Sequence, residues 1–151
     1  MSQSTTTEAR ELALKFVYQC DTEKLYYFSE AHFSSFITFQ NPSNDAKKIA
    51  KNICEGLFDK LEQIDIILNQ HSKKWTVERM PVTDRAVLRI AVHELISMKT
   101  PVSVVLNEAI ELAKKFGLKV ILKTGHKDNM KITTPDHFLE MSKILVKNFG
   151  R

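Results

Sequence analysis

Residues 79–117 decide the fold, and their sequence is RMPVTDRAVLRIAVHELISMKTPVSVVLNEAIELAKKFG. The first half of this stretch predicts a helix that begins at Thr83 or Asp84 and ends near Ile96. Apolar side chains cover nearly the whole circumference of this helix. A helix that is apolar all round is typically a buried, central one.

Arg85, Arg89 and His93 lie four residues apart and form one polar stripe on this apolar helix. A lone buried charge is costly, so the two arginines must reach solvent, a phosphate or an acidic partner. The sequence leaves these alternatives open. Acidic candidates for pairing with the arginines are Glu78, Asp84, Glu94 and Glu108.

The second half of the stretch predicts another helix, which starts at Pro101 and is terminated by Gly117. Proline suits the first turn of a helix, where its missing N–H is not needed, and glycine commonly ends one. Apolar residues at spacings of three and four would face the core. The charged residues expected on the outer face are Glu108, Glu111, Lys114 and Lys115.

The rest of the chain predicts further helices, so the expected fold class is all-α. Residues 7–20 carry apolar side chains on one face, and Ser29 can cap a short helix that ends near Gln40. A last helix is expected over residues 135–148, after an atypical insert at residues 118–134.

The longest periodic segment lies between these elements and predicts a single helix of roughly 25 residues, about 38 Å long. Ser43 or Asn44 can cap it, and its apolar spine extends to Leu68. Gly56 lies inside this helix, where glycine is unfavourable by about 1 kcal/mol against alanine. We therefore expect another helix to pack closely at Gly56.

The composition fits one helical domain of 151 residues, which we expect to be cytoplasmic. Hydrophobic residues make up 43% of the chain, yet no apolar run approaches the roughly 18 residues of a membrane span. The N-terminal residues do not resemble a secretory signal. Cys20 and Cys54 fall on apolar faces and are expected to be buried thiols, with a disulfide or metal pair as the alternative.

Charge is distributed unevenly along the chain. Residues 1–75 hold nine Lys or Arg and ten Asp or Glu, a net charge of −1. Residues 76–151 hold 13 Lys or Arg and eight Asp or Glu, a net charge of +5. A nucleic-acid partner would be expected on the basic half.

The sequence offers little for catalysis. It has no glycine-rich phosphate loop, and its five histidines show neither an HExxH motif nor zinc-finger spacing. The neighbouring pairs His126 with Asp128 and Asp136 with His137 are more typical of surface residues than of proton-transfer pairs. We therefore expect no enzymatic activity, no cofactor and no metal site.

Three basic groups favour binding instead. They are Arg10 with Lys15, the series Arg79, Arg85 and Arg89, and the lysines Lys114, Lys115, Lys119, Lys123, Lys127 and Lys131. Lysine binds phosphates as a point charge, and arginine also stacks on unpaired bases. Each group taken alone is more often a solvated face or a set of intramolecular ion pairs. Three aromatic residues lie off the predicted core faces, namely Tyr18, Tyr26 and Tyr27.

Three blocks of the sequence resemble the NusB transcription antitermination family. The blocks are residues 9–14 followed by Tyr18-Gln19, residues 84–91 followed by Glu94-Leu95, and Pro101-Val102 followed by residues 107–117. The order and spacing of the blocks also fit, and the resemblance covers residues 8–117. It implies an all-helical domain of two three-helix sub-bundles that share a core, which we divide into residues 1–75 and 76–151.

The resemblance also implies a non-enzymatic role in transcription. Together with the ribosomal protein NusE, family members bind boxA-type nascent RNA and help RNA polymerase to resist termination, chiefly on rRNA operons. The expected RNA-binding residues here are Arg10, Lys15, Arg79, Arg85, Lys114, Lys115, Lys119 and Lys123. Glu108 and Glu111 are expected to contact a basic protein partner or to brace the arginines.

The chain departs from the family pattern in two places. Thr5, Thr6 and Thr7 stand where family members commonly carry an arginine cluster that contributes to RNA binding. After Gly117 a longer stretch intervenes, and the Asn-Gly of the following family helix is missing. We hypothesise that the lysines of residues 119–131 replace part of the lost charge. The alternative is a protein-interaction module of the same fold, a homodimer or a NusE-binding protein, with weakened or lost RNA binding.

Overall fold

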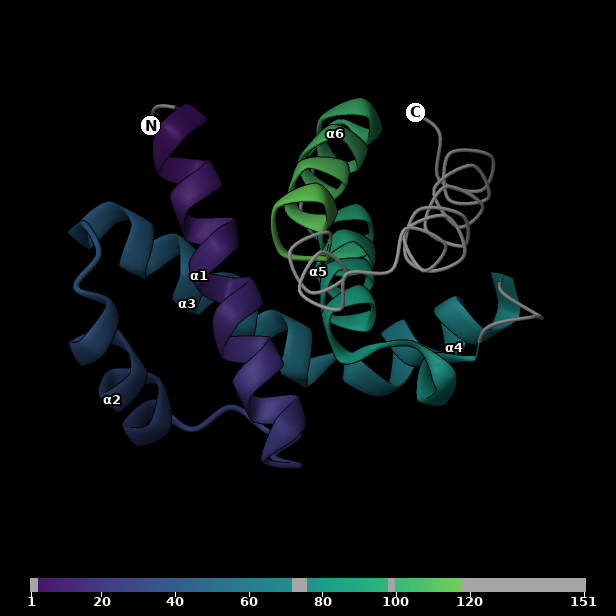
Figure 1. Cartoon of the computed structure of the whole chain (residues 1–151), viewed down its shortest axis with the longest axis horizontal. Helices are drawn as coiled ribbons and strands as arrows, with labels where there is room; N and C mark the ends of the chain where they lie inside the picture. Colours follow the sequence, from purple (N-terminus) through teal and green to yellow (C-terminus); the bar gives the residue numbers. More distant parts are fainter. Residues whose placement is uncertain (1–2, 72–75, 98–99, 118–151) are drawn as a thin grey trace, which may run out of the picture.

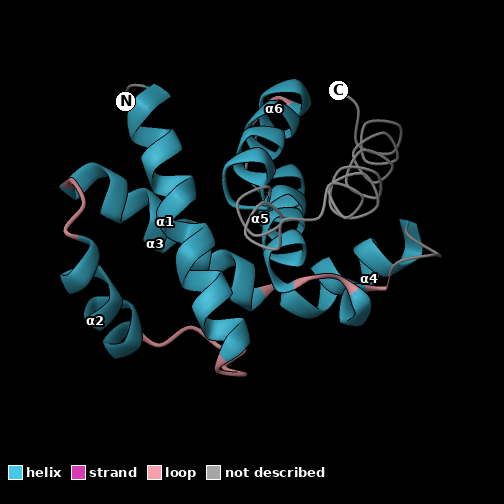
Figure 2. Cartoon of the chain, viewed as in Figure 1, coloured by secondary structure: helices cyan, strands magenta, loops and turns pink. Residues whose placement is uncertain are grey.

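The computed structural model describes residues 3–71, 76–97 and 100–117, which contain helices and no strand (Figure 2). The all-α prediction is therefore confirmed. The α-helices are α1 (Gln3–Thr22), α2 (Glu30–Gln40), α3 (Asn44–Asp59), α4 (Leu61–His71), α5 (Val82–Ser97) and α6 (Val102–Leu112). A 3-10 turn, η1 (Val77–Arg79), precedes α5, and a π-helical turn, η2 (Ala113–Gly117), follows α6. None of these helices is long and apolar enough to span a membrane.

The N-terminal helices pack around the ring of Phe16 in α1. This ring is fully buried and lies 5.1 Å from Phe33 and 5.2 Å from Phe36 of α2, measured between centroids. Phe58 of α3 completes the cluster at 6.5 Å. Helix α1 also lies across α3 (Figure 1). Edge-on and tilted aromatic contacts of this kind stabilise a core beyond the area that they bury.

Helix α5 is the centre of the fold, as its all-round apolar sequence predicts. It packs against α1, α3, α4 and α6 (Figure 1). Every residue from Asp84 to Leu95 except Arg85 is buried. The expected bounds, from Thr83 or Asp84 to Ile96, differ from the observed Val82–Ser97 by one or two residues.

The expectation of one continuous helix from Ser43 or Asn44 to Leu68 was wrong. The chain leaves helical geometry at Lys60, where φ is −112° and ψ is 16°, and α4 starts at Leu61. This break turns α4 away from α3, so that α4 packs on α5. The apolar spacing continues across Lys60 because both helices bury one face, and spacing alone does not record the change of direction.

The close approach expected at Gly56 is confirmed. A Cβ atom at Gly56 would lie 2.5 Å from Cε1 of His93 in α5, closer than real Cβ contacts come. Only glycine lets α3 and α5 approach this closely around the imidazole. The N-caps also agree with the sequence, because Ser29 accepts a hydrogen bond from the N–H of His32 and Ser43 accepts one from that of Ala46.

The second predicted helix of residues 79–117 begins after Pro101 as expected, but its end differs. α-Helical geometry stops at Leu112, and Ala113–Gly117 forms a π-helical turn instead of a continuation of α6. The helix expected at residues 135–148 and the insert at 118–134 lie outside the described residues. The division into residues 1–75 and 76–151 therefore stays a prediction.

Candidate nucleic-acid interface

Arg10 lies inside the protein rather than on its surface. Its side chain is 9% exposed, and its Nε donates to Oε1 of Glu94 in α5 at 2.8 Å. Oε2 of Glu108 in α6 lies 3.9 Å from Nη1 of Arg10. Burial raises the pKa of Glu94, an effect that the charge and hydrogen bond of Arg10 oppose. Arg10 therefore joins α1 to α5 and α6.

Arg85 and Arg89 belong to a second internal network, centred on the buried Asp21 at the end of α1. Arg85 donates to both carboxylate oxygens of Asp21, and Arg89 donates to both oxygens of Asp65 in α4. A further bond of 3.4 Å joins Arg89 to Asp21. An acidic partner was one of the alternatives that the sequence left open for both arginines. The observed partners, Asp21 and Asp65, are not among the acidic residues named from the sequence.

The charges of this network balance. Burial tends to raise the pKa of Asp21, but the hydrogen bond and charge of Arg85, together with Arg89, outweigh it and hold that pKa below its usual value. The same carboxylate raises the pKa of Arg85. The cations of Arg85 and Arg89 and the carboxylates of Asp21 and Asp65 thus form a salt-bridge network between α1, α4 and α5.

The lysines expected to bind RNA have a different environment. Lys15 of α1 and Lys114 and Lys115 of η2 are exposed. Lys115 forms an ion pair with Glu11 of α1, which brings η2 next to α1. Lys114 lies 3.8 Å from Glu111, an exposed pair that contributes little to stability. These three ammonium groups are accessible to an anionic ligand.

An exposed aromatic residue accompanies these lysines. Tyr18, one turn after Lys15 in α1, is 43% exposed. A pocket of about 220 Å³ lies beside it, lined by Leu14, Lys15, Tyr18, Thr83 and Phe116. The pocket lies between α1, the start of α5 and η2. We call this surface, with Lys114 and Lys115, the Tyr18 face.

Tyr18 was absent from the expected site. Its helical position does place it off the apolar face, which is the one signal that the sequence contains. Nothing in the sequence indicated that Phe116 of η2 would line the same pocket, because that depends on how η2 packs. Aromatic and basic side chains on one surface are what single-stranded RNA requires.

The remaining expected residues are scattered. Arg79, in η1, is exposed and makes no ion pair with the part of the chain that the structure describes. Glu108 lies 3.9 Å from Nη1 of Arg10 and accepts a hydrogen bond of 3.4 Å from Thr7, and its role in binding a partner stays a prediction. Glu111 is exposed, with 72% of its side chain open to solvent. Lys119 and Lys123 lie outside the described residues.

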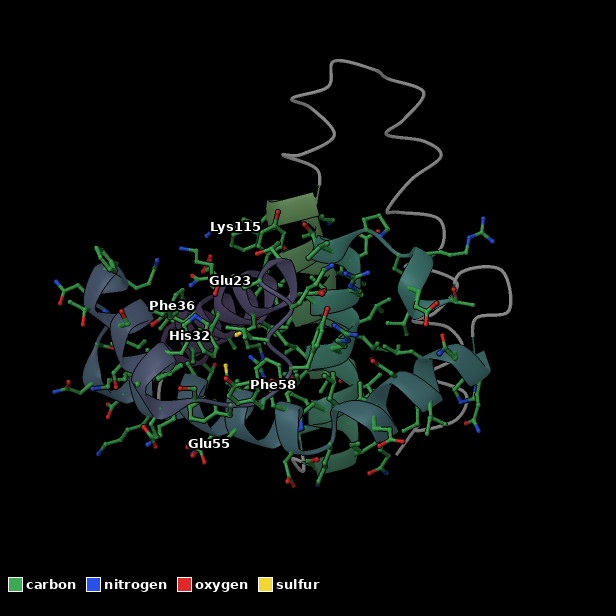
Figure 3. The ribbon with its side chains drawn as sticks, turned by 90° about the horizontal axis from the view of Figure 1, so that it is seen from below. Glu23, His32, Phe36, Glu55, Phe58 and Lys115 are labelled. Atoms are coloured by element: carbon green, nitrogen blue, oxygen red, sulfur yellow. The ribbon has the colours of Figure 1, made fainter. Side chains whose placement is uncertain are left out.

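The fold does bring a cysteine next to a histidine, a pairing that was not identifiable from spacing. Cys20 Sγ lies 3.8 Å from Nδ1 of His32. Nε2 of His32 lies 3.6 Å from a carboxylate oxygen of Glu23 (Figure 3). Burial raises the pKa of Cys20 to about 12, with Glu23 and Asp21 adding to the effect. Because the thiolate is the nucleophilic form of cysteine, this shift disfavours a reactive Cys20. Both cysteines are free and buried, as expected.

The chain matches the family model described as the NusB family over residues 7–120. Among curated proteins, it is 43% identical over 112 residues to the transcription antitermination protein NusB of Lysinibacillus sphaericus. That alignment covers 73% of this chain and 82% of the relative. NusB of Thermodesulfovibrio yellowstonii is 32% identical over 121 residues, which covers 74% of this chain and 80% of that one.

A solved structure agrees in fold. The structure of T. maritima NusB superposes with a TM-score of 0.71 at 24% sequence identity, over 97% of this chain and 91% of that one. The chain therefore has the same fold as that structure. The matching family model and the relatives above 30% identity show that the chain belongs to the NusB family of transcription antitermination proteins.

Proposed function

We propose that this protein is an RNA-binding transcription antitermination factor that binds boxA-type nascent RNA on the Tyr18 face. In this role it acts with the ribosomal protein NusE within the antitermination complex of RNA polymerase. Membership of the NusB family supports the role, since the curated relatives carry the name of transcription antitermination proteins. The role is one of binding, without catalysis.

The observation that carries the proposal is the exposed ring of Tyr18 beside a pocket and three accessible lysines. A base can stack on the ring of Tyr18, and such stacking contributes about 1–3 kcal/mol per base. Lys15, Lys114 and Lys115 lie where the flanking phosphates would run. The pocket between Tyr18 and Phe116, at about 220 Å³, offers space to an unstacked base.

Arg10 and Arg85 were expected to bind RNA directly, but in this proposal they have a structural role. Both guanidinium groups are engaged by internal carboxylates, so their contribution to RNA binding is to hold α1 against α5. Arg79 remains a candidate for a peripheral phosphate contact. Lys119 and Lys123 stay predicted phosphate ligands, as part of the lysine-rich insert that we hypothesise replaces part of the missing N-terminal arginine charge.

A protein-interaction module with lost RNA binding is the second candidate function. The observation in its favour is that Arg10 and Arg85, two of the expected RNA ligands, are neutralised inside the fold. In that case NusE or a second copy of the chain would bind without any gain from RNA. Glu111 would then be an exposed acidic contact for the basic partner.

Labelled boxA-type RNA, titrated with and without purified NusE, separates the two candidates. Tight binding that NusE enhances supports the first, and binding of NusE without any effect of RNA supports the second. Tyr18→Ala should weaken RNA binding about tenfold, whereas Tyr18→Phe keeps the ring and should retain most of the affinity. Phe39→Ala is the matched control, because Phe39 is an aromatic residue that is 85% exposed on α2.

A further inference from the structure

A second hollow, of about 590 Å³, lies away from the Tyr18 face. One wall is the segment between α1 and α2, and the other is the last turns of α3. Its lining residues are Tyr26, Tyr27, Phe28, Glu55, Gly56, Phe58 and Asp59. Figure 3 shows Glu55 and Lys115 on opposite sides of the molecule. We call this hollow the acidic groove.

The aromatic wall of the acidic groove is open to solvent. Tyr27 is 64% exposed and Tyr26 is 46% exposed. The hydroxyl of Tyr26 donates to Asp21 at 3.1 Å, which fixes its ring at the edge of the groove. The faces of tyrosine rings attract cations, arginine more often than lysine.

The opposite wall carries negative charge. Glu55 and Asp59 lie one turn apart on α3, where two like charges destabilise a helix. They also lie at the C-terminal end of α3, whose dipole is negative and whose last turn contains no basic residue. The isolated helix would be more stable with other residues at both positions.

Nearby lysines neutralise only part of this charge. Lys51 lies 3.7 Å from Glu55, but it also binds Glu30 at 2.5 Å. Lys60, the residue next to Asp59, donates to Ser97 at 2.8 Å. Asp59 has no ion pair within the described residues. The carboxylates of the groove and its exposed tyrosine rings would therefore both attract a cation.

We propose that the acidic groove docks a basic segment of a protein partner. An arginine or lysine side chain of that segment stacks on Tyr27, with its charge against Glu55 and Asp59. RNA is disfavoured here, because its phosphates would meet both carboxylates and the negative end of α3. This second interface does not depend on RNA binding at the Tyr18 face, so the protein can hold RNA and a basic partner on separate surfaces.

Fluorescence anisotropy with a labelled hexa-arginine peptide tests the proposal on the full chain. Glu55→Gln with Asp59→Asn should weaken peptide binding at least about threefold, and so should Tyr27→Leu. Tyr27→Phe should bind like the wild type. Glu62→Gln with Glu78→Gln removes the same charge from other exposed sites and should leave the affinity unchanged.

Equal peptide affinity in all these variants would overturn the proposal. A second copy of the chain is the other possible occupant of the groove, and sedimentation velocity tests for it. A dimer that dissociates in the Tyr27→Leu variant would also contradict the proposal of a basic partner. The Glu55→Gln, Asp59→Asn protein should keep the wild-type affinity for boxA-type RNA. Failure of this proposal is thus distinguishable from failure of the RNA-binding proposal.

Discussion

The guanidinium of Arg85 donates two hydrogen bonds to the carboxylate of Asp21, from Nε to Oδ2 at 2.5 Å and from Nη2 to Oδ1 at 2.9 Å. The Asp21 side chain is 2% exposed and that of Arg85 is 17% exposed. Arg89 lies on the same carboxylate from one turn further along α5. Arg85, which the sequence analysis predicts as an RNA ligand, thus links α5 to α1 through an ion pair.

Replacing Asp21 tests that ion pair. Asp21→Asn leaves Arg85 without its buried countercharge, and breaking a buried pair in this way costs roughly 3 kcal/mol or more. The free energy of unfolding, measured by urea denaturation, should fall by about this amount. Glu111→Gln is the control, since its carboxylate is exposed, and it should change stability by less than about 0.5 kcal/mol. Equal effects of the two substitutions would refute a structural role for Asp21.

Arg10 and Glu94 should show strong energetic coupling. Arg10→Gln leaves Glu94 buried without its cation, and we expect a loss of about 3 kcal/mol. The double variant Arg10→Gln, Glu94→Gln should recover a large part of this loss, because neither charge is then unpaired. The folded Arg10→Gln protein should bind RNA within about twofold of the wild type. A purely additive double variant, or a large loss of RNA affinity in folded protein, would show that Arg10 acts otherwise.

His93 should make the fold sensitive to acid. Burial, with the charge of Lys60, lowers the pKa of His93 from 6.5 to about 4, and its Nδ1 has no hydrogen-bond partner within the described residues. As the pH falls, His93 therefore becomes protonated at a higher pH in the unfolded state than in the folded state. Stability is intact above pH 6.5 and is lost progressively down to about pH 4, by roughly 3 kcal/mol.

Urea denaturation between pH 7 and pH 4 measures this dependence. His93→Leu removes the titrating group and should flatten the stability curve of the protein over that interval. Other groups titrate equally in both proteins, so the difference between the two curves isolates His93. Parallel curves would mean that His93 does not titrate differently in the folded and unfolded states.

Gly56→Ala tests the contact between α3 and α5. Alanine is favoured over glycine in a helix by about 1 kcal/mol, but its Cβ would lie 2.5 Å from the His93 ring. Overpacking usually costs about 1–3 kcal/mol, so we expect net destabilisation. In a His93→Ala background the same substitution should become neutral or stabilising. A stabilising effect with His93 present would show that the helices separate at little cost.

The sequence predicts those features of the fold that depend on local patterns. The buried character of α5, the caps at Ser29 and Ser43 and the close approach at Gly56 follow from apolar spacing and residue type. The break at Lys60 does not, because the apolar faces of α3 and α4 continue in register through it. Its cause is tertiary: α4 must turn to reach α5.

The candidate site was harder to predict, for a related reason. The sequence identifies Arg10 and Arg85 as cations but not their partners, since Glu94 and Asp21 lie 84 and 64 residues away. Lys15 and Lys115 are both exposed as expected. Tyr18 gains its importance from Phe116, a neighbour that only the packing of η2 supplies.

The salt dependence of RNA binding tests the Tyr18 face most directly. The slope of log affinity against log salt should be shallower by about two in a Lys15→Ala, Lys114→Ala, Lys115→Ala variant than in the wild type, at roughly 0.7 for each phosphate that is no longer neutralised. Lys24→Ala, Lys47→Ala, Lys48→Ala removes the same charge from exposed lysines elsewhere and should leave the slope unchanged. Equal slopes in the two triple variants would contradict RNA binding at this surface.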